Sequence, residues 1–176
     1  MSRKERLRLE RTLEAARGYL MLDMPRHALE QLDTVYDPDQ LAFEIHELRG
    51  EALQRQEDYP AALKAFRRAL LENPNSVAVL MGMGWCYKRT GQLPRAINAL
   101  KRAYRVDPDE PIVLYNLSCY FALAGDKEQT LSWLGRALRM ESSLQNLIAD
   151  ETDFDQLRGD PDFQFVTTAG RQPDAT

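Results

Sequence analysis

The feature that most constrains this chain is a repeat with a fixed step of 34 residues. Small side chains recur at that step, and bulkier ones recur between them. One series consists of Ala28, Ala62, Ala96 and Thr130, a second of Leu32, Phe66, Leu100 and Leu134, and a third of Ala16, Gly50, Gly84 and Ser118. A period of this length is typical of stacked supersecondary units. Such arrays form extended surfaces, which suit binding better than catalysis.

Glycines and prolines mark where helices begin and end within each repeat. Gly91 falls where a first helix must end in a left-handed turn. Prolines in the first turn of a helix cost no hydrogen bond, and the second helices are predicted to begin around Pro25, Pro60 and Pro94. Each repeat is therefore predicted to be a pair of antiparallel helices that approach closely where side chains are small.

The third repeat, counted from Val77, shows the pattern most clearly. It has Leu80 at position 4, Met83 and Gly84 at 7–8, Tyr87 at 11, Ala96 at 20, Leu100 at 24 and Pro108 at 32. This pattern resembles the tetratricopeptide repeat family, and the resemblance covers roughly residues 9–144. It implies an all-α fold, a right-handed α-solenoid of about four helix-turn-helix repeats with a C-terminal capping segment.

We expect three parts along the chain. Residues 1–143 form the repeat array, 144–169 a C-terminal helical cap and 170–176 a flexible tail. The repeats are placed at about 9–42, 43–76, 77–110 and 111–143. Three apolar residues of the otherwise acidic cap, Phe154, Leu157 and Phe163, are expected to anchor it on the last repeat.

Composition and charge narrow the classes of function. A net charge of −4 without a long basic stripe argues against nucleic acid as a partner. No apolar run approaches the roughly 18 residues of a membrane-spanning helix, and no hydrophobic signal core follows the basic start. Cys86 and Cys119 are too few for a disulfide framework, which favours a reducing compartment. We therefore expect a cytoplasmic protein.

No motif for catalysis or cofactor binding is apparent. The acidic residues of the cap lack the central glycine and closing glutamate of a calcium loop, so we interpret them as solvated charge; they are Asp150, Glu151, Asp153, Asp155, Asp160 and Asp162. The two histidines, His27 and His46, form no pair with cysteine or glutamate at ligand spacing. Phosphate loops and nucleophile elbows are not found. We predict no catalytic residue, no metal and no cofactor.

The family resemblance implies that the first helix of each repeat lines a concave groove. Carried over by repeat position, the candidate partner-binding residues are Arg55, Met81, Gly82, Trp85, Lys88, Arg89, Ile112, Tyr115, Asn116 and Cys119. Tryptophan and tyrosine are enriched at binding hot spots, and methionine adapts to varied apolar partners. Gly82 is expected to leave a hollow beside Trp85. Lys88, Arg89 and Arg55 are expected to form a basic edge, and Glu44, Glu47 and Glu51 an acidic edge.

The leading functional hypothesis is a non-catalytic protein–protein interaction module, an adaptor or assembly factor that binds a partner peptide or helix in the groove. Two alternatives stay open. One is a small bacterial secretion chaperone that shields a hydrophobic client, and the other is a self-assembling scaffold, a homo-oligomer. It is also open whether Trp85 and Met81 contact a neighbouring repeat or the returning C-terminal segment instead of a partner.

Overall fold

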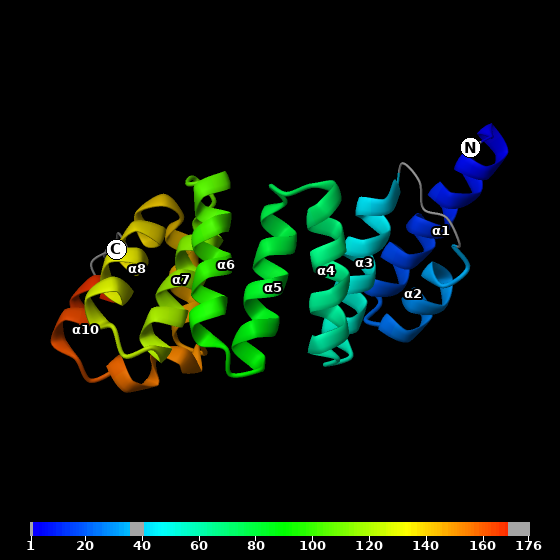
Figure 1. Ribbon diagram of the computed structural model, residues 1–176. Helices are drawn as coiled ribbons and strands as arrows, with labels where there is room; N and C mark the ends of the chain where they lie inside the picture. The colour runs from blue at the N-terminus through cyan, green and yellow to red at the C-terminus, as the bar shows by residue number, and fades with distance from the viewer. Residues whose placement is uncertain (1, 36–40, 169–176) are drawn as a thin grey trace, which may run out of the picture. The chain divides into compact units, whose positions relative to one another are not determined.

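The computed structural model describes residues 2–35 and 41–168, which form helices joined by short turns (Figure 1). Strands do not occur in these ranges, and the predicted all-α fold is confirmed. The longer helices are α1 (Arg3–Met21), α2 (Pro25–Leu32), α3 (Ala42–Arg55), α4 (Tyr59–Glu72), α5 (Val77–Arg89), α6 (Leu93–Val106), α7 (Pro111–Leu123) and α8 (Lys127–Met140). The C-terminal part has η2 (Ser142–Leu144), α9 (Gln145–Ile148), η3 (Thr152–Leu157) and α10 (Pro161–Thr168).

The chain forms two compact units, Met1–Gly91 and Gln92–Thr176. In the first unit, α1 packs on α2, α3 packs on α4, and α5 packs on α4. In the second unit, α7 packs on both α6 and α8. The boundary falls within the third predicted repeat, and each unit is described by itself below. The predicted division into array, cap and tail stays a prediction, and the tail lies outside the described residues.

A left-handed turn joins the two helices of each predicted repeat. The backbone φ is positive at Asp23, Glu57, Gly91 and Gly125, which are spaced by the repeat length. The prediction for Gly91, whose φ is 72°, is confirmed. Glycine adopts this conformation freely, whereas in a residue with a side chain it costs roughly 1–2 kcal/mol of conformational free energy. Since Asp23 and Glu57 adopt it as well, the packing of the helix pairs must outweigh the local cost.

The second helices of the first three repeats begin as the prolines predict, and acidic residues cap two of the second helices. Pro25, Pro60 and Pro94 lie in the first turns of α2, α4 and α6. The carboxylates of Asp58 and Asp126 accept backbone N–H groups at the starts of α4 and α8. These caps satisfy amide groups that have no partner within the helix.

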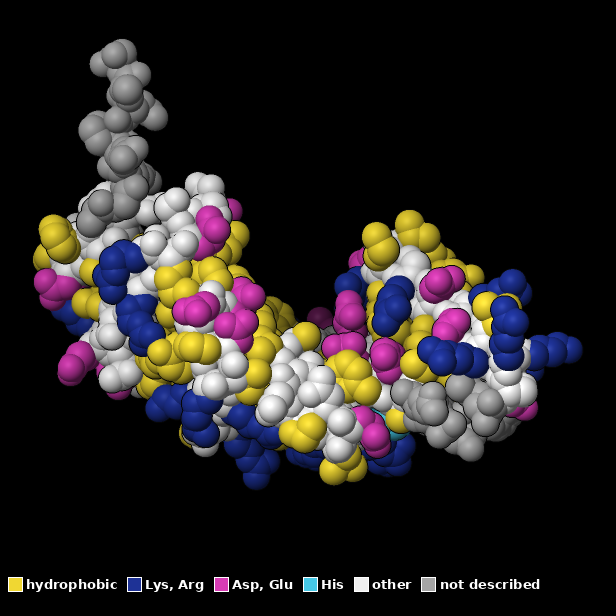
Figure 2. Space-filling model, turned by 90° about the horizontal axis from the view of Figure 1, so that it is seen from above, with side chains coloured by type: hydrophobic (Ala, Val, Ile, Leu, Met, Phe, Trp, Pro, Cys, Tyr) yellow, Lys and Arg dark blue, Asp and Glu magenta, His cyan; other side chains and the backbone are white. Residues whose placement is uncertain are grey.

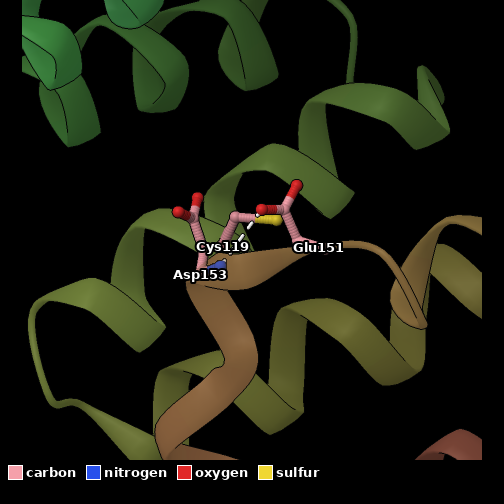
Figure 3. A group of neighbouring side chains, drawn as sticks. All are labelled: Cys119, Glu151 and Asp153. Atoms are coloured by element: carbon pink, nitrogen blue, oxygen red, sulfur yellow. Dashed lines mark hydrogen bonds between the residues drawn. The ribbon is translucent and has the colours of Figure 1, made fainter.

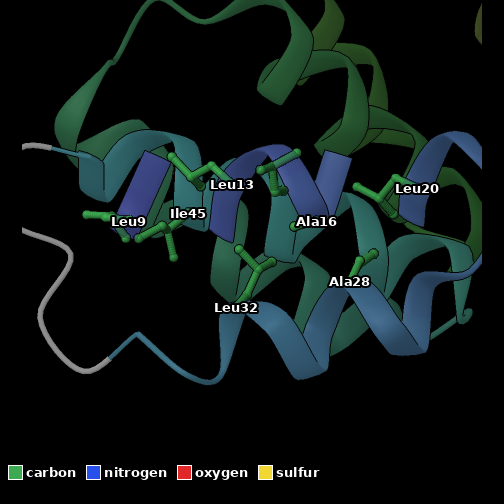
Figure 4. Close-up of a cluster of buried hydrophobic side chains, with 9 residues drawn as sticks. Leu9, Leu13, Ala16, Leu20, Ala28, Leu32 and Ile45 are labelled. Atoms are coloured by element: carbon green, nitrogen blue, oxygen red, sulfur yellow. The ribbon is translucent and has the colours of Figure 1, made fainter. Parts of the chain in front are cut away.

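The core of the first unit begins between α1, α2 and α3 (Figure 4). Ala16 and Ala28 are fully buried where α1 and α2 lie side by side. Around them lie larger side chains, namely Leu9, Leu13, Leu20, Leu32, Ile45 and Leu48. The small residues let the two backbones approach, and the larger ones fill the remaining space at the density of a protein interior.

Phe66 of α4 occupies a slot whose walls include two glycines. A Cβ at Gly50 of α3 would lie 2.4 Å from the Phe66 ring, and a Cβ at Gly82 of α5 would lie 2.7 Å from it. Phe66 is 3% exposed, so the ring has little freedom to move away. The three helices can therefore hold this spacing only because neither glycine carries a side chain.

In the second unit, α7 is buried around most of its circumference. Its residues Val113, Leu114, Leu117 and Phe121 are buried, and so are Tyr115 and Cys119. A helix that is apolar on all sides needs cover on all sides. The cover comes from α6, α8 and the C-terminal element η3, which all pack against α7.

Gly50→Ala is expected to destabilise the protein by about 1–2 kcal/mol. Overpacking of a filled core costs about 1–3 kcal/mol, which exceeds the gain of up to about 1 kcal/mol from replacing a helical glycine by alanine. Gly18→Ala is the matched control, because a Cβ there meets nothing within 4 Å. That control should gain stability. Urea denaturation of both variants checks the prediction, and equal effects would contradict it.

Candidate functional site

The surface of α5 carries the central residues of the predicted groove. Met81, Trp85 and Lys88 follow one another at helical spacing and so lie on one face. Trp85, on the last helix of the first unit, is 42% exposed, and Met81 is half-buried. The Lys88 ammonium lies 5.4 Å from the centre of the Trp85 ring. A positive charge at this distance is attracted by the π electrons of the indole ring.

Gly82 has a different role from the one predicted. We expected it to leave a hollow beside Trp85, but the space next to its Cα is filled by the tip of the Phe66 ring. The side-chain oxygen of Gln54 would lie 3.3 Å from a Cβ at this position. Gly82 is therefore a packing residue, and the expectation of a hollow is wrong.

The two arginines of the predicted basic edge make contacts within the first unit. The Arg55 guanidinium donates to the Leu20 carbonyl and to Glu51 at 2.7 Å, and it lies 3.6 Å from Asp23. Arg89 donates to the Tyr59 hydroxyl at 3.1 Å. These contacts fix the arginines in place, so a partner that paired with them would have to compete with groups of the chain itself.

The predicted acidic edge lies on α3. Glu51 pairs with Arg55, as described above, and Glu44 and Glu47 are half-buried. Burial raises the pKa of the Glu47 carboxyl, while the nearby Arg17 acts in the opposite direction. The acidic edge is thus a set of partly buried carboxylates. The negative charges of Glu47 and Glu51 are already offset by arginines of the same unit.

The groove residues of α7 divide into two groups. Ile112 and Asn116 are half-exposed. Tyr115 and Cys119, by contrast, are each 2% exposed. The expectation that Tyr115 stands on an open face is wrong, and neither Tyr115 nor Cys119 is accessible to a partner in this arrangement. The cause is the C-terminal segment, residues 142–168, which packs on the fourth repeat.

Phe154 is the centre of the C-terminal segment. It is fully buried, and its ring meets the Tyr115 ring edge-on at a centroid distance of 5.9 Å. Phe163 packs on Phe154 at 5.3 Å. Two of the three expected anchors, Phe154 and Phe163, are therefore buried, and Leu157 is half-buried. Edge-to-face aromatic contacts add about 0.5–1.5 kcal/mol each to the effect of burial.

Polar contacts hold the end of the segment on α8, beside which α10 lies in Figure 1. The Lys127 ammonium lies 2.6 Å from Asp160 and 2.7 Å from Asp162. Within the segment itself, Gln145 of α9 donates to the carbonyl of Thr167 in α10. The segment thus combines an aromatic anchor on α7 with ion pairs on α8.

The covered face of α7 brings polar groups together as well. Cys119, Glu151 and Asp153 each offer a ligand atom, and these three atoms lie within 4.8 Å of one another (Figure 3). The Tyr115 hydroxyl is buried without a hydrogen-bond partner. Burial, followed by the charges of these three groups, raises the pKa of the Tyr115 phenol well above its usual range, and Arg158 opposes them. Sequence analysis missed this cluster because its members come from separate elements.

A separate feature lies at the N-terminal end of the first unit, where basic side chains (dark blue) gather in Figure 2. Lys4, Arg8 and Arg11 line a shallow pocket together with Leu7, Thr12 and Gln31. Sequence analysis did not anticipate this pocket, which lies outside the predicted groove residues.

None of the described helices is both long enough and apolar enough to cross a membrane.

Comparison with known proteins decides the family. Two family models, each described as a tetratricopeptide repeat, match residues 13–77 and 53–139. The chain is a tetratricopeptide repeat protein. The repeat pattern of that family accounts for three features of this structure. They are the helix pairs, the left-handed turns at the repeat spacing and the small residues where helices meet. No curated protein is similar enough in sequence to count as a match.

Solved structures of tetratricopeptide repeat proteins share the fold. A crystal structure of MamA is 21% identical, with 78% of this chain and 81% of that chain covered and a TM-score of 0.70. PilF of Pseudomonas aeruginosa is 18% identical, with 98% and 80% covered and a TM-score of 0.74. YrrB, described as a TPR protein with an unusual peptide-binding site, is 21% identical, with 73% and 66% covered and a TM-score of 0.64. At these identities the likeness concerns the fold alone.

Phe154→Ala is expected to destabilise the second unit by about 3–5 kcal/mol, the usual cost of removing a buried aromatic ring. Phe165→Ala is the matched control, because Phe165 is 73% exposed on α10. Hydrogen exchange of the α7 amides, measured together with chemical denaturation, checks the prediction. If Phe154→Ala and Phe165→Ala changed the stability and the α7 hydrogen exchange equally, the claim that the C-terminal segment covers α7 would be contradicted.

Proposed function

We propose that this protein is a non-catalytic interaction module that binds a peptide or helix of another protein through the exposed face of α5. The observation that carries the proposal is the exposed indole of Trp85, which is flanked by Met81 and by the Lys88 ammonium. A large amphipathic ring on a rigid helix loses little side-chain entropy on binding, which is why such rings act as hot spots.

The described part of the chain supports a binding role more than a catalytic one. The cysteines are buried, and burial raises the pKa of the Cys86 thiol to about 11, so this thiol is a poor nucleophile. The fold places its exposed aromatic surface on a helix face instead of in a deep cleft. An adaptor or assembly factor in the cytoplasm, with a protein as partner and no cofactor, is the role that we propose.

The partner segment is expected to carry an apolar anchor for Trp85 and Met81. An acidic group beside the anchor would lie near Lys88, whose charge is close to the indole. Such a segment matches the way in which repeat proteins take up extended peptides or single helices. Gly82, Tyr115 and Cys119 are left out of the proposed surface because they are packed within their units, and Ile112 and Asn116 because they belong to the second unit.

Trp85→Ala is expected to weaken partner binding by about 30-fold, which corresponds to about 2 kcal/mol for a central hot spot. The partner is first identified by affinity capture from native lysate with mass spectrometry, and the purified partner segment is then titrated calorimetrically. Leu71→Ala is the matched control, since Leu71 is an exposed apolar residue of α4 that is not among the proposed groove residues.

The proposal fails if Trp85→Ala binds as tightly as the unaltered chain, or if Leu71→Ala causes the same loss. The same experiment separates the alternatives. A secretion chaperone would retain one hydrophobic client that is poorly soluble without it. A self-assembling scaffold would show a molar mass in light scattering that rises with protein concentration.

A further inference from the structure

Three potential metal ligands converge where the C-terminal segment crosses α7. Cys119 belongs to α7, Glu151 immediately precedes η3, and Asp153 lies in the first turn of η3 (Figure 3). One ligand atom from each lies within 4.8 Å of the others. Cys119 is 2% exposed and Asp153 8% exposed. A largely buried carboxylate beside a thiol is stabilised by a nearby positive charge, such as a bound cation.

The backbone that carries the two carboxylates is held in place before any ligand binds. The Glu151 carboxylate accepts the backbone N–H of Asp153 at 3.1 Å. The Arg158 guanidinium donates to the carbonyls of Ile148 and Glu151, at 3.2 and 2.9 Å. Because these contacts fix the turn, the ligands need little reorganisation, which is the usual condition for a selective site.

A second observation points to a ligand at the same place. Tyr115 precedes Cys119 by one helical turn, is 2% exposed, and its hydroxyl has no hydrogen-bond partner among the described residues. Cys119, Glu151 and Asp153 are among the groups whose charges act on this hydroxyl, so it lies near them. A buried hydroxyl without a partner is rare in folded proteins and often marks the place of an ion or a water.

We propose that Cys119, Glu151 and Asp153 bind a divalent transition-metal ion of the zinc type. The Tyr115 hydroxyl then hydrogen-bonds to a water in the fourth coordination position. Zinc accepts one thiolate together with carboxylates and commonly keeps water as a fourth ligand. Calcium and magnesium select oxygen ligands and do not suit the thiolate. On binding, the thiol proton passes to solvent.

The geometry needs only a small adjustment to accept such an ion. Ligand atoms of a tetrahedral zinc site lie roughly 3–4 Å apart, given the usual metal–ligand bond lengths. The three ligand atoms already lie within 4.8 Å of one another, so they would have to move only somewhat closer together when an ion binds. The ion would join α7 to η3 and so fasten the C-terminal segment over the fourth repeat.

The test uses the full-length protein after removal of metals with a chelator. Zinc is titrated by calorimetry, and cobalt(II) is titrated as a spectroscopic probe of thiolate ligation. We expect one ion per chain and a thiolate-to-cobalt absorption band that is lost in Cys119→Ser. Asp153→Asn should weaken zinc binding about tenfold or more, and Tyr115→Phe about tenfold, as for residues that orient metal-bound groups.

Two matched variants serve as controls. Cys86→Ser alters the other buried cysteine, and Asp150→Asn alters an exposed carboxylate next to Glu151. Both controls should bind zinc as the unaltered chain does, and circular dichroism checks that every variant is folded. The proposal is overturned if the unaltered chain binds no zinc at 100-fold molar excess, or if the cobalt band persists in Cys119→Ser.

Discussion

The close approach of helices at residues without bulky side chains is the constraint on which the rest of this structure depends. Phe66 of α4 lies against Gly50 of α3 and Gly82 of α5 at distances that exclude even a methyl group. Ala16 and Ala28 play the same part between α1 and α2. Since each helix pair has apolar residues on both sides of this contact, a pair cannot bury them alone and has to stack.

The same requirement for cover explains the C-terminal segment. The sequence of α7 is apolar on all sides, so two neighbouring helices leave one side of it uncovered. The segment around Phe154 supplies the missing cover and occupies a face that the family resemblance assigns to partners. The proposed binding surface is accordingly restricted to α5, where Trp85 remains exposed. A metal ion held by Cys119, Glu151 and Asp153 would strengthen this cover further.

Local features of the fold could be predicted from the sequence because local chemistry determines them. Gly91 ends its helix in a left-handed turn, and Pro60 begins the next helix of the second repeat, as short-range rules require. The candidate site was harder to predict, because a position within a repeat does not reveal what lies against it. Arg55 bonds to the distant Leu20 carbonyl, and the Phe66 ring fills the space beside Gly82. The sequence did carry a signal that Tyr115 and Cys119 are buried, because residues 111–123 are apolar except for Asn116 and Ser118.

The central claim is that the C-terminal segment, and not a partner, covers α7. It is tested most directly by the rate at which a thiol reagent labels Cys119 in the native, chelator-treated protein. Cys86 of α5, which is buried in the first unit, serves as the internal reference. The account predicts that both cysteines are labelled slowly, because each needs an opening of the structure before a reagent can reach it. Rapid labelling of Cys119 while Cys86 stays protected would contradict it.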